Sequence, residues 1–179
     1  ALIRKFFLAK CIEDNNWNSV RKDLNINPIE NINGSSEKIK IIKILEKHGI
    51  QIINDSLKGN NPLASITFWG TGNVFREFLH VDDMADACLH IFKNIESEYL
   101  YNILKETHIN IGLGEDISIK ELVNKIKKIT KSNAQILWNS KMPDGTKKKQ
   151  LSINLLKKNK WQAKIGLSDG IKNIYMDLS

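Results

Sequence analysis

Long apolar runs and cysteine are both scarce in this sequence of 179 residues. No apolar stretch approaches the roughly 20 residues that a helix needs to cross a bilayer, so we expect no membrane span. The two cysteines, Cys11 and Cys88, are too few and too far apart for a disulfide framework or a metal site. A reducing cytoplasm fits this composition.

A cofactor-binding glycine loop is also missing. The dinucleotide fingerprint needs three glycines, in the order G-x-G-x-x-G, between a strand and a helix. Two stretches, "GTGN" and "GLGE", begin such a pattern, but Phe75 and Ile117 occupy the place of the third glycine. We therefore predict tight turns after strands at both places.

The opening stretch "ALIRKFFLAKCI" lacks a small-residue cleavage site, and its basic residues lie inside the apolar run. We therefore expect an amphipathic helix from Leu2 to Ile12 rather than a targeting peptide. The net charge of +7 raises the possibility of a nucleic-acid partner. Since lysine accompanies isoleucine and asparagine throughout, we interpret the excess as compositional bias and expect no nucleic acid.

The pattern of elements predicts an α/β fold in one domain, residues 1–179. Strands alternate with helices along the chain. The expected strands are 64–68, 108–112 and 134–139, and the expected helices are 2–12, a helix after Ser36, 82–95, 118–130, 152–161 and 168–179.

Residues 11–61 differ in composition, with frequent asparagine and loop punctuation, and we interpret them as a helical insertion. Its helix is predicted to start at an N-cap, Ser36, and to stop at Gly49, with "DSLKGNNP" returning the chain to a loop. We expect one face to be buried and the other to stay in water, Ile39, Ile42 and Leu45 against Lys40, Lys43 and Lys47.

The stretch "WGTGNVFREFLHVDD" holds candidate binding residues. Trp69 beside the glycine turn can stack on a base or sugar, or pack in a core. Arg76 can bind a diphosphate through its planar fork, or pair with one of the acids that follow it, Glu77, Asp82 or Asp83.

Other groups have plainer explanations. The two aspartates can begin the next helix, whose buried stripe would be Met84, Cys88, Ile91 and Phe92. His80 and His90 are expected to be structural. Tyr101 and Lys105 spell the Tyr-x-x-x-Lys of short-chain dehydrogenases, but the segment is short and has no serine partner or cofactor loop, so we treat the match as chance. The loop "PDGTKKK" offers Asp144 to sugar hydroxyls and lysines to phosphate, or it is a solvated charge run.

Taken together, "ALIRKF", "WGTG...REFLHVDDMADA", "INIGLGEDISIKEL" and "PDGTKKK" resemble the C-terminal portion of the GDP-L-fucose synthase family. These are extended short-chain dehydrogenases/reductases, and the resemblance covers the chain outside residues 11–61. It implies conversion of GDP-4-keto-6-deoxy-D-mannose to GDP-L-fucose, by 3,5-epimerisation and NADPH-dependent 4-reduction, in a cytoplasmic homodimer. The family's Rossmann half, with its cofactor loop and catalytic residues, has no counterpart here. The isolated chain is therefore expected to be inactive, with no catalytic, cofactor-binding or metal residue.

The resemblance also implies substrate-binding residues. In the family a basic residue of the first helix reaches the GDP phosphates, and Lys5 matches it. Trp69 matches a substrate contact, Arg76 a diphosphate ligand, Asp144 the aspartate of the last loop, and Lys149 the basic residue after it. The insertion near Lys5 and Trp69 leaves a related GDP-6-deoxy-sugar or heptose as an alternative substrate. A stand-alone nucleotide-sugar binding module is the alternative from another class, and an upstream reading frame with a cofactor loop would exclude it.

Overall fold

The computed structural model describes residues 1–53 and 62–178. The chain forms two compact units. The first comprises Ala1–Gly72, Lys120–Asp144 and Ile171–Ser179, and the second comprises Asn73–Ile119 and Gly145–Gly170. Within the described residues, each helix is too short or too polar to span a bilayer.

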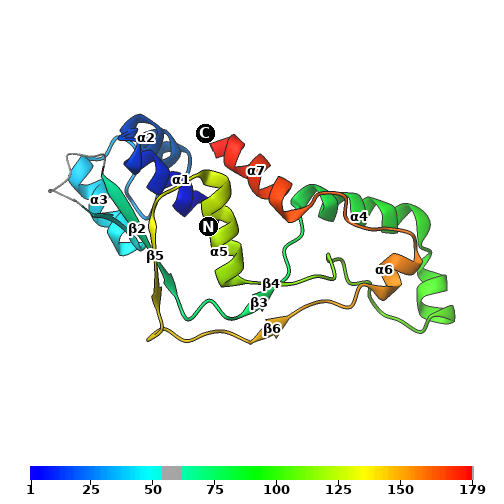
Figure 1. Cartoon of the computed structure of the whole chain (residues 1–179). Coiled ribbons are helices and arrows are strands. Elements are labelled where there is room, and N and C mark those ends of the chain that lie inside the picture. Colours follow the sequence, from blue (N-terminus) through cyan, green and yellow to red (C-terminus); the bar gives the residue numbers. More distant parts are fainter. Residues whose placement is uncertain (54–61, 179) are drawn as a thin grey trace. The chain divides into compact units, whose positions relative to one another are not determined.

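The predicted α/β class is confirmed, with two small three-stranded sheets (Figure 1). The helices are α1 (Leu2–Glu13), α2 (Trp17–Ile26), α3 (Lys38–Lys47), α4 (Val81–Asn94), η1 (Tyr99–Ile103), α5 (Ile119–Thr130), α6 (Asn154–Lys158) and α7 (Leu167–Leu178). The strands are β1 (Ile50–Ile53), β2 (Leu63–Trp69), β3 (Phe75–Arg76), β4 (Ile117–Ser118), β5 (Gln135–Asn139) and β6 (Lys148–Lys149).

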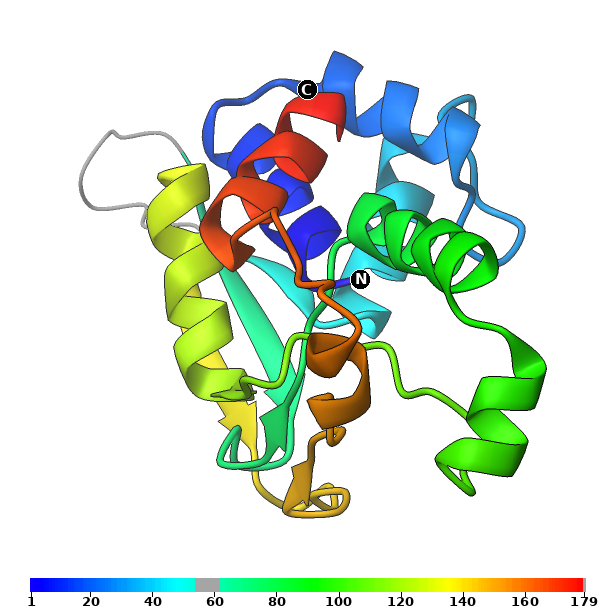
Figure 2. The ribbon, with the colours of Figure 1, turned by 90° about the vertical axis from the view of Figure 1, so that its right-hand side faces the viewer.

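The first unit is built on the sheet β1-β2-β5. Strand β2 lies in the middle, antiparallel to β1 with Ile50 opposite Ile66, and parallel to β5 with Ile66 opposite Ile136. Helix α1 packs on β2 and α3 packs on β1 (Figures 1 and 2). Phe6 of α1 is fully buried and stacks on Phe68 of β2 with 6.1 Å between ring centroids. This unit therefore has a core between helices and sheet.

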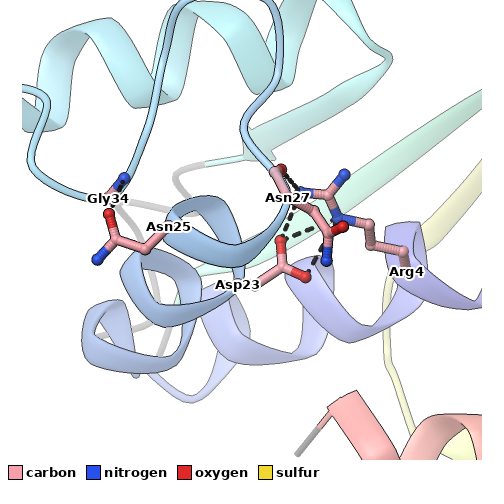
Figure 3. A network of polar contacts seen from close by, with 5 residues as sticks. All are labelled: Arg4, Asp23, Asn25, Asn27 and Gly34. Carbon is pink, nitrogen blue, oxygen red and sulfur yellow. Dashed lines mark hydrogen bonds and ion pairs between the residues drawn. The ribbon is translucent and has the colours of Figure 1, made fainter.

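A partly buried ion pair joins α1 to α2, which lies within the predicted insertion, residues 11–61 (Figure 3). The Arg4 guanidinium donates to both oxygens of Asp23, at 2.7 to 3.1 Å, and also to the carbonyl oxygen of Asn27. The Asp23 side chain is only 2% exposed. Further along, the Asn25 side chain accepts from Gly34 N–H at 2.9 Å. Removal of Arg4 would leave the buried Asp23 carboxylate without its cation, which is costly, so the pair fixes α2 to α1.

The second unit has a smaller core and shorter strands. Strand β3 lies between β4, which is antiparallel to it, and β6, which is parallel. Ala87, Leu156 and Trp161 are its buried centre, with partly buried apolar neighbours around them. Polar ties complete the unit: Asp83 is 2% exposed and accepts the backbone N–H groups of Lys164 at 3.1 Å and Ile165 at 2.9 Å.

Helix α3 differs from its prediction at its start and on its buried face. Its N-cap is Glu37 rather than Ser36, whose hydroxyl instead accepts from Asn33 N–H in the preceding turn. The buried residues are Ile41, Ile44 and Leu45, whereas the predicted Ile39 is 66% exposed. The predicted lysine face is exposed as expected. Five isoleucines and leucines in seven positions made the apolar face ambiguous.

Helix α4 also turns a different face inward. It buries Asp83 and Ala87, while Met84, Cys88 and Phe92 of the predicted stripe are exposed. His80, not an aspartate, is the N-cap, and its Nδ1 accepts from Asp82 N–H at 3.3 Å. The prediction failed because Asp83 is buried through hydrogen bonds to another segment, which apolar periodicity cannot reveal.

Two further predictions of secondary structure need correction. Residues 108–112, expected as a strand, form an irregular segment, and β4 follows it. Helix α2 and strand β1 lie in a stretch that was interpreted mainly as loop. The predicted loop "DSLKGNNP" lies, apart from its last residue, outside the described residues.

Candidate functional site

A cavity of about 600 Å³ in the second unit contains two of the predicted binding residues. Arg76 ends β3 and lies opposite Lys149 of β6 in the parallel register. The other lining residues come from the segment after β3, helix α4, the irregular segment and the segment after β6: Glu77, Leu79, Met84, Ile111, Gly112, Gln150 and Leu151. Strand pairing thus brings together two cations that are 73 positions apart in sequence.

Arg76 is held by carbonyl groups rather than by acids. Its Nη1 donates to the carbonyl oxygens of Phe75 at 2.6 Å and Thr146 at 2.7 Å. Among the described residues, no carboxylate forms an ion pair with Arg76, so the alternative of a structural pair with Glu77, Asp82 or Asp83 does not apply. Backbone dipoles orient the guanidinium without neutralising it, which leaves its charge available to an anion.

Glu77 is a residue of this cavity that the sequence analysis placed only as a partner for Arg76. Its Oε1 accepts from Gly114 N–H at 2.5 Å, and its Oε2 accepts from Leu151 N–H at 3.0 Å. The carboxylate therefore bonds to the backbone on two sides of the cavity. Nothing in the local sequence indicates these partners, which are 37 and 74 positions away.

Three predicted residues belong to the first unit. Trp69 ends β2 and is 74% exposed, so its indole is not part of the core. Asp144 accepts from Thr71 N–H at 2.9 Å and from the Thr71 hydroxyl at 2.6 Å. These bonds, the one from the hydroxyl first, lower the pKa of Asp144 below its usual value. A carboxylate fixed in this way is ionised at neutral pH and keeps lone pairs for a further donor.

Lys5 is the third residue, and it is partly buried near the sheet. Its ammonium lies 5.6 Å from the centroid of the Phe68 ring. Burial lowers the pKa of Lys5 because the charged form loses hydration there. Within residues 1–53 and 62–178, Lys5 Nζ has no acidic partner. An anion beside Lys5 would offset that desolvation.

The glycine turns have no room for a dinucleotide phosphate. An added Cβ on Gly70 would lie 2.2 Å from Asp144 Oδ1, and one on Gly72 would lie 2.5 Å from the Trp138 ring. In the second glycine pair, an added Cβ on Gly112 would lie 2.5 Å from Glu77 Oε1, and one on Gly114 would lie 2.4 Å from Ile153 Cδ1. The chain's own side chains thus fill these faces, so these two glycine turns do not fit the pyrophosphate of NADPH.

The Tyr-x-x-x-Lys sequence does not lie in one helix. Tyr101 belongs to η1, which ends at Ile103, and Lys105 follows with a positive φ of 58°. Among the described residues, no group of three or more histidine, cysteine, aspartate or glutamate side chains is placed to hold a metal ion.

Comparison with known proteins identifies the relatives of this chain. Residues 42–112 match the NAD dependent epimerase/dehydratase family. GDP-L-fucose synthase 1 from Arabidopsis thaliana is 36% identical over 115 residues, which are 64% of this chain and 33% of that protein. The chain therefore matches about a third of the length of this curated relative.

Two solved structures match almost the whole chain. A GDP-D-glycero-L-gluco-heptose synthase from Campylobacter jejuni, solved in the presence of NADPH, is 31% identical, with a TM-score of 0.76, over 98% of this chain and 45% of that one. A GDP-mannoheptose C4 reductase from Campylobacter jejuni with NADP bound is 33% identical, with a TM-score of 0.70, over 98% of this chain and 44% of that one. The predicted resemblance is confirmed: the chain is similar to GDP-L-fucose synthases over part of their length, and its residues 42–112 match the epimerase/dehydratase family.

Proposed function

We propose that this chain supplies the GDP-sugar-binding residues of an NADPH-dependent epimerase/reductase that forms GDP-L-fucose from GDP-4-keto-6-deoxy-D-mannose. The relatives named for GDP-sugars support the substrate class and the cofactor. The observation that carries the binding role is the pair of cations, Arg76 and Lys149, lining one cavity without a carboxylate partner among the described residues.

In this proposal Arg76 and Lys149 bind diphosphate oxygens. A guanidinium held in place by two carbonyl groups loses little freedom on binding, and its fork matches phosphate geometry. Lys5, Trp69 and Asp144 of the first unit are proposed to contribute a phosphate contact, a stacking surface and an acceptor for hydroxyl groups. The NADPH site and the catalytic residues are proposed to lie outside the residues described.

The direct test is titration of the chain with GDP. We expect Arg76→Ala to weaken GDP binding by about thirty- to hundredfold, the scale of a lost charged hydrogen-bond pair. Arg76→Lys should restore little of this, because an ammonium cannot form the fork. Lys148→Ala is the matched control: it removes a neighbouring cation that pairs with Asp116 at 3.1 Å and does not line the cavity. Equal GDP affinity in wild type and Arg76→Ala, with stability lost instead, would assign Arg76 a structural role.

A second candidate is a reductase of a GDP-heptose. The two heptose enzymes cover 98% of this chain, including most of residues 11–61, whereas the fucose synthase match covers 64%. Competition for the chain between GDP-L-fucose and GDP-mannoheptose distinguishes the candidates. Preference for the heptose would favour the reductase, and preference for the fucose would favour the epimerase/reductase.

A further inference from the structure

Glu77 bonds to two walls of the cavity at once. One wall is the segment Ile111–Gly112, which continues to Gly114, and the other runs from Lys149 to Leu151. Each carboxylate oxygen accepts one backbone N–H, from Gly114 or from Leu151. The Gln150 side chain adds a direct bond between the walls, from its amide nitrogen to the carbonyl oxygen of Gly114 at 2.5 Å. The Glu77 carboxylate is thus one of the groups that fix the distance between the walls, and it is the one that bonds to the backbone of both.

The backbone of the first wall is shaped around this carboxylate. An added Cβ on Gly112 would lie 2.5 Å from Glu77 Oε1 and 3.0 Å from its Cδ. Gly112 is not among the glycines with positive φ, so its backbone conformation suits other residues. The absence of a side chain at position 112 thus makes room for the carboxylate.

These contacts also decide the charge of the cavity. A carboxylate next to Arg76 in sequence would ordinarily be expected to pair with it and cancel the charge. Here Glu77 is bonded to backbone N–H groups, and Arg76 donates to carbonyl groups. Acid and base are each satisfied by the backbone, which leaves the guanidinium without a counter-ion among the described residues.

We propose that Glu77 is a positioning residue: it holds the two walls at the separation that a nucleoside diphosphate needs beside Arg76 and Lys149, which strand pairing brings together. This inference rests on the proposed function. Glu77 itself does not contact the ligand in this proposal, because a carboxylate repels a diphosphate.

The variant Glu77→Gln keeps the length of the side chain. Its lost negative charge and its lost hydrogen-bond acceptor predict opposite effects on GDP affinity. Removal of a negative charge alone tightens binding of an anion. Loss of one acceptor removes the hydrogen bond to one of the two walls. We therefore expect GDP to bind about tenfold more weakly, the scale of a backbone donor left without its acceptor. Glu115→Gln is the matched control, since Glu115 is exposed on the same loop. It should change GDP affinity by less than about threefold and in the tighter direction.

Gly112→Ala tests the same contact from the other side. Its methyl group collides with the Glu77 carboxylate, so we expect GDP binding to weaken by a similar factor. In the double variant Glu77→Gln/Gly112→Ala the effects should not multiply, because both act through one contact. The amide ¹H shifts of Gly114 and Leu151 report the two bonds directly and should move in both single variants. Titrations are made well below the melting temperature of each variant, so that a loss of stability does not appear as a loss of affinity.

The outcomes separate the two claims. Wild type that binds no GDP overturns the proposed function and this inference together. Wild type that binds GDP, with Glu77→Gln equal or tighter and Gly112→Ala unchanged, overturns the positioning role alone. Weaker binding in both variants, less than multiplicative in the double, with Glu115→Gln near wild type, supports it.

Discussion

The two units are stabilised by different interactions. In the first unit, helices and sheet bury large apolar side chains, and among the described residues all of the largest fully buried ones except Leu156 belong to it. The second unit has three strands of two residues each, and carboxylates of Glu77, Asp83 and Asp86 connect its segments. Apolar burial is not directional, whereas hydrogen bonds fix particular distances. The second unit, in which the cavity lies, should therefore depend more on distances that hydrogen bonds fix. In the first unit, buried polar contacts such as the Arg4–Asp23 pair should be similarly sensitive to change.

The largest expected effect is on the apolar core of the first unit. Phe6→Ala removes a fully buried ring that stacks on Phe68, and we expect the free energy of unfolding to fall by about 3–5 kcal/mol. Phe92→Ala, on a ring that is 86% exposed in the second unit, is the matched control and should have almost no effect. Urea unfolding followed by circular dichroism measures both. Equal losses of unfolding free energy in the two variants would contradict the assignment of Phe6 to the core and of Phe92 to the surface.

A smaller effect is expected from the polar ties of the second unit. Asp83→Asn keeps the shape but leaves one of two backbone donors, on Lys164 or Ile165, without its acceptor. We expect the free energy of unfolding to fall by about 1–3 kcal/mol. Asp82→Asn is the control next to it. Its side chain is 77% exposed, with His80 Nδ1 at 3.6 Å and the positive end of the helix dipole beside it, so a loss under about 1 kcal/mol is expected. The same urea experiment decides, and a larger loss for Asp82→Asn would contradict the assigned role of Asp83.

The same contrast explains what the sequence predicted. Long periodic segments such as α1 and α5 were located well, because apolar spacing directly reflects burial on one face. Helix α4 was located correctly, but its buried face was not, because that face carries Asp83 and Ala87 instead of large apolar residues. Two-residue strands have no periodicity to detect, so β3, β4 and β6 were not predictable.

The resemblance to a known family identified the candidate binding residues, but the sequence did not predict how they are arranged in space. Arg76 and Lys149 were named from motifs, but their pairing depends on the register of β3 and β6, which only the folded chain provides. The role of Glu77 depends on backbone N–H groups far away in sequence, and a backbone donor has no side-chain signature. Sites built from backbone contacts are therefore the least visible from sequence.

The smallest expected effect is that of acidic pH on the hydrogen bond between Trp161 and Asp86. Trp161 Nε1–H donates to Asp86 Oδ2 at 2.9 Å, and Lys164 lies 3.2 Å from the same oxygen. The hydrogen bond from Trp161, and then that from Lys164, lowers the pKa of Asp86 below the usual 3.8. Because the folded-state pKa is the lower one, the stability from this carboxylate is complete above the usual value and is lost as pH falls through the folded-state pKa.

We expect the indole ¹H–¹⁵N signal of Trp161 to shift in acid with a midpoint below 3.8. Asp86→Asn should abolish that shift. The signal of Trp17, whose ring lies 4.1 Å from the Lys38 ammonium, should change less, because an ammonium stays charged in acid. A midpoint at or above the usual aspartate value would mean that this tie contributes nothing to the second unit.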